Sequence, residues 1–596
     1  MNKHIQLIKN IILLVVLTGF MSCDNDFLER YPLTSISDGG FWVTATDLRL
    51  YVNNFYNSDD LLPSYTWSTD GGPFSIDANE GSDIKIALEY NRRMNGENTV
   101  PASGGGWDWG TLRKINYFLD NYKKSTESWE AIKEYVGEAL FFRSIFYFNK
   151  LKSFGDLPWI STVLRTDSEE LFDARLPRNQ VVDSIMYDLD RAVEYLPERS
   201  AWTGRLTKET AMLLQARIAL FEGTWEKYHA LKNTPFKTTG SDGSKFIRKA
   251  ADVSGALMVL AEKNGATALV DGMNNGYTNI FNQLDYSTNK EVLFWRKYSA
   301  SENVSHRFGR VLWSGAGNGI TKSMVDSYLC IDGNPISVSP LYQGDKDLMT
   351  VVANRDPRMI QSINVDDGKH VRWTQNNTFF QYPTFNEAFN LRDNSGYSLY
   401  KGNRGDYVEY QSMLCYQGVI YGRYAEALLI YAEARAELGE ITQNDIDKTI
   451  NALRRRVGMN EGLLNMNSIT ADPKWEFSGI SPILNEIRRE RKVELICEGF
   501  RHDDIYRWAA ADEIIVGKRP KGATWEQWRD YPDASDIFLS SWAVLPVDED
   551  GYIDPYRNFP ALNNGYRFNL NRDYLSPLST NDLTLNSKLK QNPGWE

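Results

Sequence analysis

The stretch between Ala131 and Lys152 constrains the fold more than any other part of the chain, because its apolar residues recur at helical spacing. They stand three or four positions apart, so that they share one side of an α-helix. The residues on this side are Tyr135, Ala139, Phe142, Phe146 and Asn149. Gly155 and Pro158 then follow, and both residue types are typical of a helix end. We predict a long helix here, with its apolar side packed against other elements.

The same spacing predicts several more helices, many of them closed by glycine or proline. They cover Asp47 to Tyr56, Thr111 to Tyr122, Val181 to Leu196, Thr207 to Glu222, Tyr424 to Leu438, Asp445 to Arg456 and Pro482 towards Glu498. Gly223, Gly439 and Gly458 are predicted to stand just past the ends of three of them. Paired helices with short glycine-containing turns favour a mainly α fold on a helix-pair scaffold like that of tetratricopeptide repeats. The sequence has no regular repeat period, so any repeat is structural.

Two stretches lack these helical patterns and are rich in Gly, Asn, Asp and aromatic residues. They run from about residue 57 to 110 and from about residue 232 to 418. Long loops on a rigid scaffold often carry function, and the aromatic residues argue against disorder. We predict one domain over residues 23–596, with a helical scaffold at about 41–230 and 419–596 and loop-rich insertions in the two stretches.

The composition excludes several classes of protein. Hydrophobic residues make up 42% and charged residues 24%, which is ordinary for a globular chain and argues against disorder and against a polytopic membrane protein. The formal net charge is -12, and no stretch concentrates Lys and Arg. The phosphate backbone of a nucleic acid is therefore a poor partner, and we expect no nucleic acid ligand.

The four cysteines, Cys23, Cys330, Cys415 and Cys497, are far apart in the sequence. They form no C-x-x-C pair, which argues against a zinc site and a disulfide framework, and the last three are predicted to be buried free thiols. The segment VDEDGYIDPY, residues 547–556, lacks an EF-hand loop's acidic residues at both ends, so we predict a polar turn. HExxH and GxSxG motifs are absent as well. We expect no metal, no cofactor and no catalytic residue.

The first 22 residues have the form of a secretory signal. Lys3 and Lys9 precede the apolar run Ile11 to Met21, and Ser22 and Cys23 follow. At about 1.5 Å per residue, a helix of this run is too short for a bilayer core of roughly 30 Å. The alternative, a buried N-terminal helix, fits poorly with a basic flank and a Cys directly after the run.

A small residue followed by Cys resembles a bacterial lipobox, in which the Cys thiol receives diacylglycerol and becomes the new N-terminus. The resemblance implies cleavage of residues 1–22 and a lipid anchor on Cys23 that carries acyl chains such as palmitate. Phe20 stands where an aliphatic residue is usual. Asp24 and Asp26 resemble the acidic signal that sends lipoproteins of Bacteroidota to the cell exterior. We expect an outer-membrane lipoprotein exposed on the cell surface.

Motifs along nearly the whole chain resemble the SusD/RagB family of nutrient-binding outer-membrane lipoproteins. In the family's order, they are CDNDFLERYPLTSISDGGFW (23–42), GWDWGTLRKINYFLDN (106–121), GEALFFRSIFYFNKLKSFGDLPWI (137–160), GRLTKETAMLLQARIALFEGTW (204–225), NRDPRM (354–359), RYAEALLIYAEARAELG (423–439), INALRRRVG (450–458), EIRRERKVELICEGFRHDDIYRW (486–508) and YLSPLSTNDLTLNSKLKQNPGW (574–595). One such match would be weak, whereas the ordered set is specific. Ser576 and Leu578 depart from the residues that are commoner in the last motif.

The resemblance implies a SusD-like fold and a receptor that is not an enzyme. Such a receptor captures an oligosaccharide or polysaccharide and delivers it to a SusC-like TonB-dependent transporter in the outer membrane. Two alternatives stay open. The chain resembles RagB-like members that handle peptides, and a surface glycoside hydrolase would also carry exposed aromatic and acidic residues.

Candidate ligand-binding residues lie in the loop-rich stretches, because the apolar faces of sugars stack on aromatic rings and their hydroxyl groups pair with planar polar groups. A first group is Tyr65, Trp67, Asp70 and Phe74; a second is Tyr298 and Trp313; a third is Arg372, Trp373 and Tyr382. The resemblance gives the first two groups more weight, because the family builds its ligand face in those places. Trp109, Trp508 and Trp595 fall in scaffold motifs and are predicted to be packing residues.

The charged run from Arg488 to Glu494 has a structural interpretation rather than a catalytic one. Arg491 and Glu494 are three positions apart, as are Glu498 and Arg501. At that spacing on a helix, each pair can form locally. We predict structural ion pairs.

Overall fold

The structure is a computed structural model. It describes residues 41–62, 81–200, 203–265, 276–309, 312, 319–365, 367–368, 394–412, 414–529 and 546–596.

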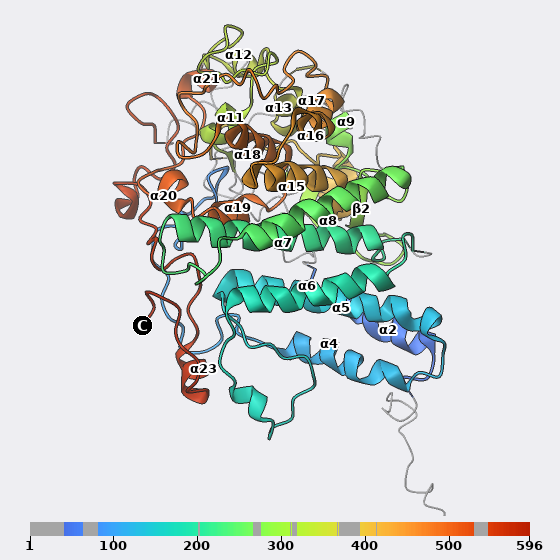
Figure 1. Cartoon of the computed structure of the whole chain (residues 1–596). Coiled ribbons are helices and arrows are strands. Elements are labelled where there is room, and N and C mark those ends of the chain that lie inside the picture. Colours follow the sequence, from blue (N-terminus) through green and yellow to red (C-terminus); the bar gives the residue numbers. More distant parts are fainter. Residues whose placement is uncertain are drawn as a thin grey trace, which may run out of the picture.

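Long helices stacked side by side form the body of the molecule (Figure 1). They are α2 (Ala45–Tyr56), α4 (Gly110–Asn121), α5 (Trp129–Phe154), α6 (Arg178–Tyr195), α7 (Lys208–Leu231), α8 (Ser244–Lys263), α15 (Tyr424–Glu437) and α18 (Pro482–Glu494). From α5 to α8 each helix packs on the next one in the sequence, and α15 then packs between α8 and α18. This confirms the mainly α fold, and it is consistent with a helix-pair scaffold.

Most of the shorter elements gather at the end of the stack away from α4 and along one side of it (Figure 1). The short helices are η2 (Tyr122–Lys124), η3 (Glu169–Phe172), α9 (Gly276–Asn279), α11 (Lys322–Ser327), α12 (Leu348–Val352), α13 (Pro357–Ser362), α14 (Tyr407–Ser412), α16 (Gln443–Lys448), α17 (Ile450–Arg456), α19 (Arg501–Arg507), α20 (Ala511–Ile514), α21 (Trp525–Arg529), η8 (Pro560–Leu562) and α23 (Thr580–Leu585). The strands are β1 (Lys85–Ile86), β2 (Val292–Arg296), β3 (Gly319–Ile320) and β4 (Val419–Arg423). They pair antiparallel, β1 with β3 and β2 with β4.

Two large hydrophobic cores hold the described parts of the chain together. The larger core lies between the stacked helices and includes Phe142 of α5, Leu189 of α6 and Ile218 of α7. The smaller core lies among the shorter elements and includes Tyr277 and Trp528. Most of the helices expected from apolar spacing are present within a few residues of their predicted ends.

The prediction that a helix ends at Gly223 is wrong, because α7 runs through this residue to Leu231. Gly223 is instead a contact point between two helices. A Cβ at residue 223 would lie 2.6 Å from Cγ1 of Ile247 and 2.9 Å from the carbonyl oxygen of Gly243. Both distances are far below van der Waals contact, so the absence of a side chain lets α8 approach α7 closely.

Two further predictions about helices are corrected. The stretch predicted to be loop-rich contains the 20-residue helix α8, whose buried residues recur at helical spacing, as Phe246, Ala250 and Leu257 do. The helix expected from Asp445 to Arg456 is divided at Thr449, whose φ of -115° and ψ of -89° lie outside the helical region. The chain therefore forms α16 and α17 in place of one helix.

Candidate functional site

The predicted ligand-binding loops start from neighbouring points on the scaffold. Arg296, at the end of β2, donates from Nη2 to the side-chain oxygen of Asn57 at 3.2 Å, although the two residues are far apart in the sequence. The backbones of His306 and Cys415 exchange two hydrogen bonds, of 3.0 and 2.7 Å. Hydrogen bonds thus link a residue before the first loop to one at the start of the second, and another residue of the second loop to one after the third.

A cavity of about 250 Å³ lies where these loops begin. Leu61 and Leu62 line it immediately before residue 63, and His306 and Phe308 line it just before residue 310. Its other walls come from α5, α7, the segment between α9 and β2, β2, β4 and the turn before α19. The aromatic residues among them are Phe141, Phe148, Phe281, Tyr286, Phe294, Tyr421 and Phe500. We call this hollow the loop cavity.

Charged side chains also line the loop cavity, and each of them has an opposite partner. Lys152 lies 2.9 Å from Asp503. Arg217 donates to both carboxylate oxygens of Glu426, at 2.6 and 2.7 Å. The loop cavity therefore combines aromatic walls with a polar floor. Because the charges of the floor cancel in pairs, none of them is uncompensated.

Glu498, at the floor of the loop cavity, shows how the surrounding charges set a pKa. Burial alone would raise its pKa, but Arg423 and Lys401 outweigh burial and hold the pKa below its ordinary value. Arg423 donates to this carboxylate at 2.6 and 2.8 Å, and Lys401 at 2.6 Å. Glu498 is therefore an ionised structural group rather than a proton donor.

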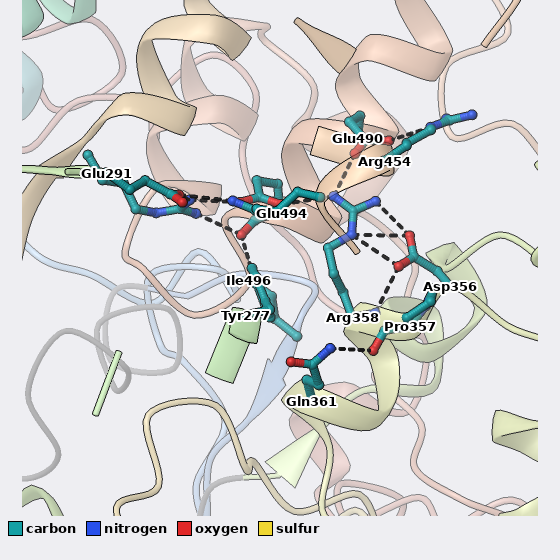
Figure 2. A network of polar contacts seen from close by, with 12 residues as sticks. Tyr277, Glu291, Asp356, Pro357, Arg358, Gln361, Arg454, Glu490, Glu494 and Ile496 are labelled. Atoms are coloured by element: carbon teal, nitrogen blue, oxygen red, sulfur yellow. Dashed lines mark hydrogen bonds and ion pairs between the residues drawn. The ribbon is translucent and has the colours of Figure 1, made fainter. Parts of the chain in front are cut away.

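A buried ion-pair network lies beneath the loop cavity, with Glu494 of α18 as its hub (Figure 2). Glu494 accepts from Arg358 at 2.9 Å, from Arg423 at 2.7 Å, and from Arg456 at 2.6 and 2.7 Å. Burial would raise its pKa, yet the three guanidinium groups hold the pKa well below the ordinary range. They come from α13, β4 and α17, so Glu494 joins three separate elements to the helical stack.

The network extends outward through shared partners. Figure 2 shows Arg358 between Asp356 and Glu490. Its guanidinium nitrogens lie 2.6 Å from Asp356 and 2.5 Å from Glu490. Arg454 reaches the same Glu490 at 2.9 Å. Glu291, just before β2, accepts from Arg423 at 3.0 Å and from Arg456 at 2.9 Å. Ion pairs between buried side chains thus hold the floor of the loop cavity in place.

These contacts confirm structural ion pairing in the charged run, whereas the predicted local partners are wrong. Arg491 pairs with Asp504 at 2.8 Å, and Arg501 pairs with Asp83 at 2.6 Å. Glu494 is already occupied by the three arginines of the network, and for the second pair the reason is that α18 ends at Glu494. Cys497 and Gly499 then adopt φ values of 57° and 83° and turn the chain, so Glu498 and Arg501 do not share a helix face.

His306 is a buried neutral side chain in the wall of the loop cavity. Its Nδ1 accepts from the backbone N–H of Phe308 at 3.1 Å, and its Nε2 lies 2.8 Å from the carbonyl oxygen of Gln417. This arrangement places the proton on Nε2. Burial lowers the pKa of His306 to about 4, against a smaller opposing effect of the bond to Gln417.

Among the predicted ligand residues, the structure describes Tyr298. Its ring is 3% exposed and lies edge-on to His306, with the ring centres 4.6 Å apart. Tyr298 therefore belongs to the packed base of the second loop. Trp67, Asp70, Phe74, Trp313, Arg372, Trp373 and Tyr382 lie outside the described residues, as do Tyr65 and Cys23.

The tryptophans predicted to be scaffold residues divide into two kinds. Trp508 and Trp595 are 1% and 7% exposed, which confirms their packing role. Trp109 is only partly buried, and it lines a second hollow together with Trp107. The sequence analysis missed that hollow and the charged floor of the loop cavity. A usable signal for the floor was a charged residue inside an otherwise apolar helix, as at Arg217 and Glu426.

Other predictions about chemistry can be compared with the described residues. Cys330, Cys415 and Cys497 are buried and form no disulfide, as expected. Asp548 accepts from the backbone N–H groups of Asp550 and Tyr552, which confirms a polar turn there. Within the described ranges, no group of three or more His, Cys, Asp or Glu side chains could hold a metal ion. None of the described helices is long and apolar enough to span a membrane.

Two family models match the sequence. The model described as the SusD family matches residues 279–595. The model described as "Starch-binding associating with outer membrane" matches residues 109–220. The two matched ranges include the walls of the loop cavity on α5, α7, β2 and β4.

Curated relatives and solved structures resemble the chain along most of its length. SusD-like protein P2 of Formosa agariphila is 23% identical over 604 residues, covering 98% of each chain. SusD-like protein P38 of the same organism is 21% identical and covers 87% of this chain and 95% of its own length. A SusD-like carbohydrate-binding protein from Bacteroides fragilis has a TM-score of 0.67 at 21% identity, over 92% of this chain and 100% of its own. Another SusD-like protein from that organism has a TM-score of 0.67 at 22% identity, over 95% of this chain and 100% of its own.

Proposed function

Because this chain belongs to the SusD family, we propose that it is a glycan-binding protein that captures saccharides with the loop cavity and the loops around it. The observation that carries the proposal is the convergence of the loop bases on one aromatic-lined cavity whose charges are already paired. One solved relative is itself described as carbohydrate binding.

The chemistry of the loop cavity suits a neutral saccharide. Aromatic walls such as Tyr421 and Phe500, which are only partly buried, offer flat apolar surfaces to the C–H faces of a sugar ring. Hydroxyl groups need donors and acceptors without a net charge, and ion pairs such as Arg217–Glu426 provide both at once. A strongly charged ligand would meet no excess of opposite charge there.

The same chemistry favours binding without catalysis. A glycoside hydrolase generally needs two carboxyl groups in its site, one of them a proton donor with a raised pKa. The acids that line the loop cavity, Glu426, Glu498 and Asp503, each pair with a cation, and the pKa of Glu498 is lowered. Incubation of the purified protein with polysaccharides should yield no new reducing ends, and their appearance would establish an enzyme instead.

Calorimetry with the mature protein tests the binding proposal. A panel of oligosaccharides and a peptide library should separate a glycan receptor from a RagB-like peptide receptor, which would share this fold. We expect saturable binding of a glycan. Binding of peptides without glycans would overturn the proposal and favour the alternative.

Trp67 and Trp313 are our strongest predictions for direct contact with the glycan, because they lie in the two loops whose bases line the cavity. Trp67→Ala and Trp313→Ala should each weaken binding by about 1–3 kcal/mol, the range for burying a large apolar side chain. Their melting temperatures should stay close to that of the unaltered protein. Trp508→Ala is the matched control, because Trp508 is buried in the core and its loss should lower the melting temperature.

The location of the protein forms a second part of the proposal. We propose that the protein is an outer-membrane lipoprotein, anchored through Cys23 and exposed on the cell surface. The match to a family model that is described as associating with the outer membrane supports this location. Cys23→Ala should abolish lipid labelling and release the protein from the membrane, because the acyl chains provide the anchor. Unchanged membrane retention of this variant would contradict the lipobox.

The partner of such a lipoprotein is expected to be a SusC-like TonB-dependent transporter. Binding alone brings no saccharide through the outer membrane, so a receptor needs a channel beside it. We expect a large β-barrel transporter to co-purify after extraction in mild detergent. Repeated recovery of the protein alone, also after chemical cross-linking in cells, would contradict a stable partnership.

A further inference from the structure

We propose that the chain has a second saccharide-binding site, in a groove lined by Trp107 and Trp109 on the other side of α5 from the loop cavity. We call it the Trp groove. It is a hollow of about 380 Å³, within the size range of small-molecule sites. Trp109 packs against Phe146 of α5, whereas the loop cavity is lined by Ile145 and Phe148 of the same helix. The two hollows share no lining residue.

Three segments that are far apart in the sequence build the Trp groove. The first half of α4, with Leu112 and Asn116, forms one wall. The excursion between α5 and α6 supplies Leu164 and Leu171, and the C-terminal region supplies Leu585. Figure 1 shows this excursion and α23 at the lower left of the molecule, beside α4.

The two indole rings are held from behind and stay open at the groove. Trp107 and Trp109 meet edge to face, with ring centres 5.1 Å apart at an angle of 83°. Trp107 also rests edge-on against Phe154 at 5.0 Å. Such contacts fix the rings before a ligand arrives, so that stacking on them requires little additional ordering.

Neither indole N–H of this pair has a hydrogen-bond partner among the residues that the structure describes. Three buried tryptophans bond theirs internally: Trp225 donates to Phe236, Trp508 to Glu433 and Trp595 to Leu575. A tryptophan with one buried side usually directs its N–H to a partner. Two free donors in one hollow are therefore suited to the oxygen atoms of a ligand.

Acceptors are available at the edge of the same groove. The carboxylate of Glu170 makes no ion pair or hydrogen bond within the described part of the chain. Asp173 has only a distant cation, with Lys588 at 4.0 Å, and its side chain is more than half exposed. Hydroxyl groups of a sugar could donate to both, as they do to carboxylates in general.

The combination selects a saccharide over a purely apolar ligand. Leu171 and Leu585 are 43% and 65% exposed, so the walls present unburied apolar surface that the C–H face of a pyranose could cover. An acyl chain or an apolar side chain would cover the same leucines. It would leave two indole N–H groups and a carboxylate desolvated without partners, which is unfavourable.

The indole signals of the ¹⁵N-tryptophan-labelled mature protein test this proposal directly. Trp107→Phe and Trp109→Phe assign the two signals, because each variant loses one of them. Titration with neutral monosaccharides and disaccharides should shift both signals in a saturable way for at least one sugar. Glu170→Gln should weaken that binding about five- to tenfold, since it removes a charged acceptor, while Glu169→Gln, one position earlier, should not.

Four outcomes are distinguishable. If no saccharide shifts either signal, the second site does not exist. If octanoate shifts both signals and sugars do not, the groove takes apolar ligands and the proposal is overturned. Saccharide-induced shifts that persist in Trp67→Ala and Trp313→Ala variants would establish a site independent of the loops, whereas shifts that vanish in those variants would assign the effect to the loop cavity.

Discussion

The loop cavity and the Trp groove flank the same helix, α5, yet they treat polar groups in opposite ways. Around the loop cavity each of the charged side chains described above is paired, as Arg217 is with Glu426, and the buried network of Glu494 lies beneath it. At the Trp groove, two indole N–H groups and the carboxylate of Glu170 have no partner among the described residues. This difference in pairing indicates which polar groups stabilise the fold and which are available to bind a ligand. Groups that satisfy one another hold the fold, and unsatisfied groups at a surface remain for a ligand.

Burial explains why the network has to be complete. Taking a charge out of water costs several kcal/mol, and the attraction between partners repays this only when geometry and hydrogen bonds are good. Removing one member of the network leaves its partners buried and unpaired. Removing a polar group at the rim of the Trp groove leaves no other group unpaired, and solvent fills the place of the lost side chain. The predictions below test this contrast, from the largest expected effect to the smallest.

Glu494→Ala should have the largest effect, because Arg358, Arg423 and Arg456 would lose a shared carboxylate inside the protein. We expect the free energy of unfolding to fall by about 3–5 kcal/mol, the range for breaking a buried ion pair. Urea denaturation measures it. The matched control is Glu549→Ala, because Glu549 pairs only with Arg557 at the surface, and it should leave stability nearly unchanged. Equal effects of the two variants would refute the contrast.

His306 should make the stability of the loop cavity depend on pH. Its pKa is about 4 in the folded protein, below the value of about 6.5 for an exposed histidine. The unfolded chain therefore takes up a proton from pH 6.5 downward, while the folded protein does so only near pH 4. The stabilisation is complete above pH 6.5 and is lost as the pH falls, by up to about 3 kcal/mol at pH 4.

The comparison with His306→Gln isolates this contribution, because other groups also titrate in acid. The free energy of unfolding of the variant should fall less steeply between pH 6.5 and pH 4 than that of the unaltered protein. Identical slopes would show that His306 is not held neutral by burial.

The helices of the stack could be predicted because their signals are local. Apolar residues three and four positions apart, followed by Gly155 or Pro197, specify both the face and the end of a helix. Gly223 misled the prediction because the same residue type also serves close packing of two helices, and only the position of Gly243 and Ile247 distinguishes these roles. Local sequence cannot show which helix lies opposite.

The site was less predictable because its partners are distant in the sequence. Glu494 joins arginines 38, 71 and 136 positions away, and no spacing rule covers such separations. The loops could be recognised by composition, and the bond between Asn57 and Arg296 shows that two of them start side by side. The motif around Trp109 predicts a packing residue, and this is correct for the side of its ring that contacts Phe146.

A double-mutant cycle on Arg217 and Glu426 should give an intermediate effect, because this pair lies at the edge of the loop cavity. Glu426 is buried, whereas Arg217 is about one quarter exposed, with 27% of its side chain accessible. We expect a coupling energy of about 1–2 kcal/mol from Arg217→Met, Glu426→Gln and the double variant. A value near zero would mean that the charges of the cavity floor are screened like those of a surface pair.

Glu170→Gln should have the smallest effect on stability, and for that reason it is the sharpest test of the contrast. Its carboxylate lies on η3 at the rim of the Trp groove and has no partner among the described residues, so the substitution breaks no contact within the fold. We expect the free energy of unfolding to change by less than about 0.5 kcal/mol, as for surface substitutions away from packed groups. Urea denaturation of this variant beside Glu494→Ala measures both ends of the range. A loss of several kcal/mol would mean that Glu170 holds the excursion between α5 and α6 in place. The polar groups of the Trp groove would then stabilise the fold, as those of the loop cavity do, and the contrast between the two hollows would be wrong.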